Sequence, residues 1–288
     1  MKNRKHISTK IENLDWKTDY EEIVFLLTSY AFPWDYQKSL EFALFRTYAV
    51  PSISKLLSKT EEFKNRTRKR YDDTELILSE IMENGLDSEY AKQAFIRMNK
   101  MHNSYKIANE DFLYVLGTFV FTPIRWIDKY SWRSLTENEK SAIFQFQHEV
   151  GKRMGIQNLP KDLNAFEQFF DDYETKYFRK TDTNEEIAGY TLDLLLGFYL
   201  PKSLYFLGKP VARCFMDKPL LNAVNLEEAP AFLKKIISFS MKVRASAIYL
   251  LPERKKPFLR TKLKRPTYPK GYKIEVLGTF PEKELGSN

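Results

Sequence analysis

The stretch FLYVLGTFVF at residues 112–121 is the longest mostly apolar run in the chain. A helix that is apolar on all sides must be covered by other elements of the fold. The run cannot cross a bilayer, because a membrane-spanning helix needs about 20 apolar residues. It therefore predicts a helix at the centre of a globular domain. Pro123 should close that helix, because proline is unfavourable in a helix interior.

Most other segments carry apolar residues at spacings of three and four, the period of an amphipathic helix. Aromatic residues make up 15% of the chain, with 22 Phe and 17 Tyr against only 10 Gly, and this composition suits a helical core. We therefore predict an all-α fold. The predicted helices include residues 19–30, 34–50, 91–111, 164–180, 184–200 and 230–251, and a helix with a Thr136–Glu139 capping box.

The chain is long enough for one large helical domain, which we place at residues 19–253. An N-terminal extension at residues 1–18 precedes it. Residues 254–288 are basic and rich in proline, and we expect them to be extended, either packed on the domain or flexible. Within them, residues 273–277 could pair briefly as a strand.

Lys and Arg together number 46 against 38 acidic residues, so the surface should favour phosphates, anionic lipid or acidic partners. The single cysteine, Cys214, excludes an internal disulfide and a cysteine-rich metal cluster, which fits a reducing compartment. The N-terminus lacks the apolar run of a secretory signal. These features predict a cytoplasmic protein, with peripheral contact to a membrane as a further option.

Residues 91–111 form the stretch that matters most for function, because a histidine lies on the apolar face of the predicted helix. Its apolar positions are Ala91, Ala94, Phe95, Met98, Met101, Tyr105 and Ala108, and His102 falls inside this stripe. A buried imidazole requires a partner, which can be a protein group or a metal. On the pattern alone, a core histidine bonded to a protein group is the commoner outcome.

The basic run at residues 66–70 has three interpretations. It can be a solvated helix face, a patch that binds nucleic acid or directs nuclear import, or the start of an inward-facing group. The third arises because Arg70 and Thr74 share a helix face with the aliphatic residues Ile77 and Ile81. An arginine turned inward needs an anion or a carboxylate.

Several stretches resemble one known family. They are Arg70 with Thr74, FALFRTYAVPSIS at residues 42–54, RMNKMHNSYKIANEDFLYVLGTFVFTPIRWID at 97–128, EVGKRMGIQNLP at 149–160, LLPERKKP at 250–257 and YPKGYKIEVLG at 268–278. The chain resembles the MpaB-type oxygenases of fungal meroterpenoid biosynthesis and, more distantly, the latex clearing proteins that cleave rubber. The resemblance extends roughly from Trp34 to Leu277.

The resemblance implies a haem b group in an all-α, globin-like core, with His102 as the proximal iron ligand. Arg70 and Thr74 fall on family positions beside the haem, where Arg70 could hold a propionate and Thr74 could donate a hydrogen bond. Met98, Met101 and Tyr105 would form the wall against the cofactor. The implied reaction uses O₂ to cleave a C=C bond of a small apolar substrate, such as a prenyl compound, and needs no nucleic acid.

The sequence departs from the family pattern at three places. The carboxylate proposed as catalytic base in the rubber-cleaving relatives has no clear counterpart in this chain. Rubber-cleaving relatives have a lysine that can occupy the distal iron position, whereas this chain has Asp73 there. The fungal members carry a membrane-spanning N-terminus that has no match here.

Two other functions compete with the oxygenase. One is a basic helical module that binds nucleic acid or anionic lipid through residues 66–70 and the tail cations. Those tail cations are Arg254, Lys255, Lys256, Arg260, Lys262, Lys264 and Arg265. The other is a haem carrier or sensor without turnover.

Overall fold

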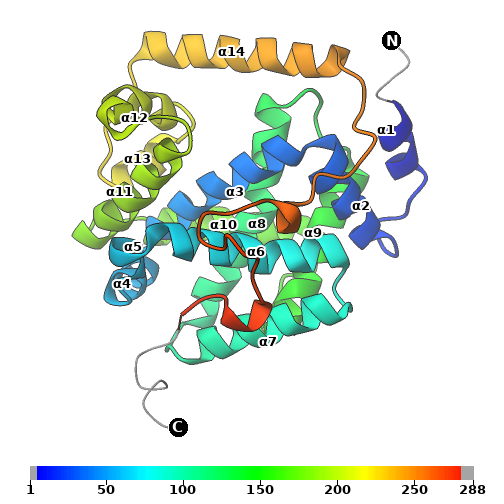
Figure 1. Cartoon of the computed structure of the whole chain (residues 1–288), viewed down its shortest axis with the longest axis horizontal. Helices are drawn as coiled ribbons and strands as arrows, with labels where there is room; N and C mark the ends of the chain where they lie inside the picture. The colour runs from blue at the N-terminus through cyan, green and yellow to red at the C-terminus, as the bar shows by residue number, and fades with distance from the viewer. Residues whose placement is uncertain (1–4, 280–288) are drawn as a thin grey trace.

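The computed structural model describes residues 5–279, and in this range it contains helices and no β-strand, as predicted (Figure 1). The α-helices are α1 (Lys5–Glu12), α2 (Tyr20–Leu26), α3 (Pro33–Tyr48), α4 (Pro51–Lys59), α5 (Glu62–Asn65), α6 (Thr67–Asn84), α7 (Glu89–Asn103), α8 (Asn109–Tyr130), α9 (Glu137–Arg153), α10 (Leu163–Tyr177), α11 (Asp182–Gly197), α12 (Tyr205–Arg213), α13 (Lys218–Ala223) and α14 (Ala231–Leu250). A π-helical turn, η1 (Leu27–Ala31), and three 3₁₀ turns, η2 (Lys202–Leu204), η3 (Arg260–Lys262) and η4 (Ile274–Val276), complete the elements. The chain forms a single all-α domain.

α8 lies at the centre of this domain, as the apolar run at residues 112–121 predicts. It packs most extensively along α3, and α9 and α10 cover its other sides. Two glycines allow this close approach: a Cβ on Gly117 would lie 2.8 Å from a ring carbon of Phe170, and one on Gly151 would lie 2.7 Å from Leu116. The central helix is therefore enclosed by neighbours at short distances.

The prediction that Pro123 closes this helix is wrong. α8 continues through Pro123 to Tyr130. Proline removes one backbone hydrogen bond, but the following turns bury Trp126 and Ile127 in the core. Burial of these large side chains offsets the lost bond.

The prediction of one helix over residues 91–111 is also wrong, because the chain breaks after Asn103. The backbone N–H groups of Ser104 and Tyr105 donate to the carbonyls three residues back, at 3.2 and 3.1 Å, and this tightening ends α7. α8 begins at Asn109, whose side chain exchanges two hydrogen bonds with the backbone of Gln157, at 2.9 and 2.8 Å. Tyr105 therefore lies in a loop rather than on the helix.

Residues 254–279 run across α6 toward α7 (Figure 1). The expected short strand at residues 273–277 is instead the 3₁₀ turn η4. A spacing of three suits this turn, because it places Ile274 and Leu277 on one side, where both are buried.

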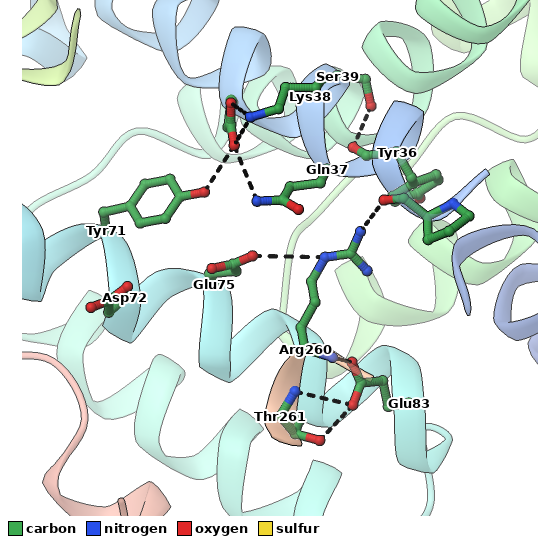
Figure 2. A network of polar contacts seen from close by, with 12 residues as sticks. Tyr36, Gln37, Lys38, Ser39, Tyr71, Asp72, Glu75, Glu83, Arg260 and Thr261 are labelled. Atoms are coloured by element: carbon green, nitrogen blue, oxygen red, sulfur yellow. Dashed lines mark hydrogen bonds and ion pairs between the residues drawn. The ribbon is translucent and has the colours of Figure 1, made fainter. Parts of the chain in front are cut away.

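A buried arginine, Arg260, fixes the start of this segment between α3 and α6 (Figure 2). Its guanidinium donates to the carbonyl of Pro33 at 2.5 Å, and its backbone N–H donates to Glu83 at 2.6 Å. Thr261 donates to the same carboxylate at 2.6 Å. The start of the segment is thus bonded to Pro33 and Glu83, which precede Arg260 by 227 and 177 residues.

Within residues 5–279, no helix combines the length and the apolar character that crossing a membrane requires.

Candidate functional site

His102 occupies the last turn of α7, with its side chain turned into the protein. Its Nδ1 atom is inaccessible to solvent and has no hydrogen-bond partner. The imidazole meets the ring of Phe112, on α8, edge to face with 5.2 Å between ring centroids. A buried imidazole normally has a hydrogen-bond partner, so this one is available to a ligand.

Arg70 and Thr74 lie one turn apart on α6, as their spacing predicts. The guanidinium of Arg70 donates to the hydroxyl of Thr74, and that hydroxyl donates to the carbonyl of Arg70 at 3.0 Å. The guanidinium also lies over the ring of Phe63, on α5, at 5.6 Å from its centroid. No carboxylate in the described part of the chain forms an ion pair with Arg70.

The positive charge of Arg70 affects the pKa of His102. Burial, and then the positive charge of Arg70, lower the pKa of His102 to about 4. His102 is therefore neutral at pH 7, which is the form that can donate a lone pair to a metal. Arg70 in turn lacks a counter-anion, so an anionic group bound between these residues would be stabilised.

The other three predicted residues surround the same site to different extents. Met98, on α7, is buried in the core. Met101, which precedes His102 in the sequence, is partly buried. Tyr105 follows in the loop, where burial, and then the charge of Glu62, raise the pKa of its hydroxyl. The positive charge of Arg70 opposes this rise in the pKa of Tyr105. Arg70 thus interacts with Thr74, His102 and Tyr105, whereas the side chain of Met101 lies against Gly278 and Met98 is buried in the core.

A small cavity of about 40 Å³ adjoins Thr74, between α3, α6 and α8. Its apolar lining residues are Leu40, Leu44, Leu78, Met82 and Phe119. Its polar residues include Glu41, Tyr71, Glu75 and Arg260. A cavity of this size holds one or two water molecules.

The polar lining of this cavity includes Glu41, a residue the sequence analysis did not single out. Its carboxylate accepts hydrogen bonds from Lys38 at 2.6 Å and from the hydroxyl of Tyr71 at 3.3 Å. Burial raises the pKa of Glu41, although the ammonium of Lys38 opposes the rise. The only sequence signal is its place one residue from Leu40, on the edge of the predicted apolar face.

Asp73 is directed away from this cavity and serves a different purpose. It is buried, and its carboxylate accepts hydrogen bonds from Lys69 at 2.6 Å and from the backbone of Gly278 at 2.9 Å. The hydroxyl of Tyr268 donates to it as well. The position that carries a lysine in the rubber-cleaving relatives thus anchors the C-terminal segment in this chain.

A larger cavity of about 180 Å³ lies elsewhere, between α3, α8 and the segment before α13. Aromatic rings such as Phe42 and Trp126 line it, and no histidine does. Its arginines are already paired: Arg46 with Glu174, and Arg125 with Asp171. We therefore place the candidate site at His102, where a buried imidazole nitrogen without a hydrogen-bond partner interacts with the charge of Arg70.

The donor set at His102 suits a cofactor that brings most of its own ligands. No group of three potential metal-ligating side chains converges within residues 5–279. One neutral imidazole and one uncompensated guanidinium match the axial and propionate contacts of a haem. A porphyrin far exceeds the cavity beside Thr74, whose lining includes neither Arg70 nor His102.

Comparison with known proteins identifies the family of this chain. Residues 48–254 match the family described as "ER-bound oxygenase mpaB/B'/Rubber oxygenase, catalytic domain". The ER-bound oxygenase mpaB' of Penicillium brevicompactum is 34% identical over 251 residues, which are 80% of this chain and 59% of that relative. The ER-bound oxygenase mpaB of Penicillium roqueforti is 33% identical over 211 residues, which are 67% of this chain and 70% of the relative.

The chain thus spans little more than half of the first of these relatives. The match includes α6 and α7, which carry Arg70, Thr74 and His102. This chain belongs to the family of the ER-bound oxygenases mpaB and mpaB' and the rubber oxygenases, and residues 48–254 correspond to the catalytic domain of that family.

Proposed function

We propose that this protein is a haem b-dependent oxygenase that cleaves a C=C bond of a small apolar substrate, such as an isoprenoid, into carbonyl products. The observation that supports it best is the buried, unpartnered Nδ1 atom of His102 beside a guanidinium without a counter-anion. Bound haem would supply the iron at which dioxygen is activated. The chain's own residues hold the cofactor, orient the alkene and exclude water.

Each predicted residue has a defined task in this proposal. The neutral imidazole of His102 holds the iron, and the low pKa of about 4 keeps it unprotonated over the physiological range. Arg70 holds a propionate by charge-assisted hydrogen bonds. The hydroxyl of Thr74 adjoins the cavity and would donate a hydrogen bond toward the reacting groups after releasing the carbonyl of Arg70.

The basic run at residues 66–70 gives less support to a nucleic-acid module. Arg66 pairs with Glu62, Arg68 pairs with Asp72 at 2.8 Å, and Lys69 pairs with Asp73 at 2.6 Å. Cations compensated by carboxylates on the same helical stretch release few counterions when they meet a phosphate backbone. These ion pairs therefore argue against the nucleic-acid module.

Reconstitution with haem tests the proposal. We expect purified protein mixed with hemin to show a Soret band, and His102→Ala to lose it together with at least about 90% of the haem affinity, since the axial ligand is removed. His148→Ala is the matched control, because His148 also has a buried Nδ1 without a partner. A Soret band that persists unchanged in His102→Ala, or none in the wild type, contradicts the proposal.

Turnover separates an oxygenase from a haem carrier or sensor. Reduced, haem-loaded protein should consume O₂ when a prenylated or polyisoprenoid alkene is added, and two carbonyl groups, aldehyde or ketone, should appear for each O₂ consumed. Haem binding without substrate-dependent O₂ uptake would identify a carrier or sensor. Because the relatives are named ER-bound, we further propose that the chain meets its apolar substrate at a membrane surface.

A further inference from the structure

α14 has two apolar faces, and only one of them is covered. The inner face comprises Leu233, Ile237, Met241 and Ile248, which are buried or partly buried. The outer face comprises Phe232, Ile236, Phe239, Val243 and Leu250, whose exposed fractions lie between 52% and 79%. At 100° per residue these five side chains fall within about 60° of one another and form a continuous stripe. We call these five residues the outer stripe.

α14 runs along the edge of the molecule, outside the other helices (Figure 1). It contacts α12, which adds the exposed residues Phe206 and Leu207, and it contacts α8. Isolated exposed apolar residues are ordinary on a protein surface, but an aligned stripe of this length marks an interaction surface.

The charged residues of α14 itself are all positive. α14 contains Lys234, Lys235, Lys242 and Arg244 and no acidic residue. Lys235 and Lys242 are exposed and lie on the flank of the stripe, where their ammonium groups can reach the level of lipid headgroups. The exposed residues Arg254, Lys255 and Lys256 follow the helix directly. This charge distribution disfavours a second copy of the chain, because pairing two stripes would bring like charges together.

We propose that the outer stripe docks this protein onto an anionic lipid surface, with α14 lying in the plane of the headgroups. An apolar stripe flanked by lysines is the pattern of helices that bind a membrane interface. Phe232, Phe239 and Leu250 enter the acyl boundary, and Lys235 and Lys242 pair with anionic headgroups. The proposal is independent of haem binding at His102.

Sedimentation with vesicles tests it. We expect the wild type to sediment with vesicles of equimolar phosphatidylcholine and phosphatidylserine, and less with phosphatidylcholine alone or at high salt. The triple variant Ile236→Ser/Phe239→Ser/Val243→Ser should bind at least about tenfold more weakly, because three apolar side chains no longer leave water. Lys235→Glu/Lys242→Glu should lose the preference for the anionic vesicles.

The control is Tyr90→Ser/Ile96→Ser, which changes two exposed apolar residues on α7. It should bind vesicles as the wild type does. Circular dichroism establishes that each variant is folded. The proposal is overturned if the folded triple variant binds as well as the wild type, or if the wild type binds neither kind of vesicle. A dimer in solution that the triple variant dissolves, without vesicle binding, would assign the outer stripe to self-association instead.

Discussion

His102 illustrates how a single side chain depends on its surroundings for the property that a metal ligand needs. In water its pKa lies near 6.5, and at that value a fraction of the imidazole is protonated at neutral pH. In the fold, burial and the charge of Arg70 lower the pKa to about 4. The same change couples the ionisation of His102 to the stability of the protein.

We predict that the haem-free protein loses stability through His102 as the pH falls from 6.5 to 4. In this window the unfolded chain binds a proton at His102 and the folded chain does not, so acid favours unfolding. The contribution is at most about 3 kcal/mol. Urea unfolding at several pH values should show a smaller pH dependence in His102→Gln than in the wild type. Equal pH dependence would contradict the low pKa.

Gly278 supplies a second prediction at the scale of one residue. Its φ of +74° is unfavourable for other residues, and a Cβ there would clash with the sulfur of Met101, beside His102. Gly278→Ala should therefore destabilise the protein by more than about 1 kcal/mol. Gly271→Ala is the matched control, since Gly271 has a φ of +90° but open space around its Cβ position. Thermal unfolding should show the larger loss at Gly278, and equal losses would show that Met101 yields without cost.

At the scale of the element, α7 is the support of the candidate site. Its first turn is capped by Ser88, whose hydroxyl accepts a hydrogen bond from the backbone of Ala91 at 3.1 Å. Its last turn carries His102. A loss of helical order at the start of α7 therefore acts on the register of the imidazole.

We predict that Ser88→Ala lowers the free energy of unfolding by about 1 kcal/mol, because a backbone N–H at the helix start loses its acceptor. Ser88→Asp, which keeps an acceptor, should remain near the wild type. Hydrogen exchange should quicken in the first turn of α7 in the alanine variant. If Ser88→Asp and Ser88→Ala are equally destabilised, the cap is not the cause.

The helices themselves follow well from the sequence. Helical periodicity located α3, α10, α11 and α14 to within a few residues, and the capping box at Thr136 and Glu139 is present. The two errors, at Pro123 and at residues 91–111, arise where tertiary contacts override local preference. Core burial carries α8 through the proline, and the hydrogen bonds between Asn109 and Gln157 fix a new helix start.

The candidate site was predictable only in part. Arg70 and Thr74 share a turn because four residues separate them, and that contact follows from the sequence alone. Glu41, Tyr71 and Arg260 could not be placed together in this way, since they come from three distant segments. The assignment of roles to Arg70, Thr74 and His102 came from the family resemblance and stays a prediction.

At the scale of the whole molecule, residues 254–279 join the end of the chain to α6. Arg265 is buried, and its guanidinium pairs with Asp72 at 3.0 Å and with Glu75 at 2.6 Å. Thr267 donates to Asp72 at 2.6 Å. Part of the positive charge of this segment therefore forms ion pairs that attach it to α6.

We predict that Arg265→Met destabilises the protein by about 3 kcal/mol, because the buried carboxylate of Asp72 and the partly buried carboxylate of Glu75 lose their shared partner. Lys264→Met is the matched control, since Lys264 is the exposed neighbour, and it should change stability by less than about 0.5 kcal/mol. Denaturant unfolding measures both, and limited proteolysis should show faster cleavage within residues 254–279 in Arg265→Met alone. Similar behaviour of the two variants would argue against the ion pairs.

The contact of residues 258–278 with α6 and α7 has a consequence for biosynthesis. A ribosome releases α6 and α7 long before it has translated the segment that covers them. Until Arg265 and Gly278 have been translated and have folded back, the buried carboxylates of Asp72 and Asp73 lack these two partners. The packing around α7 is therefore completed only when residues 258–278 fold onto it, and until then Met101, the neighbour of His102 in sequence, lacks its contact with Gly278.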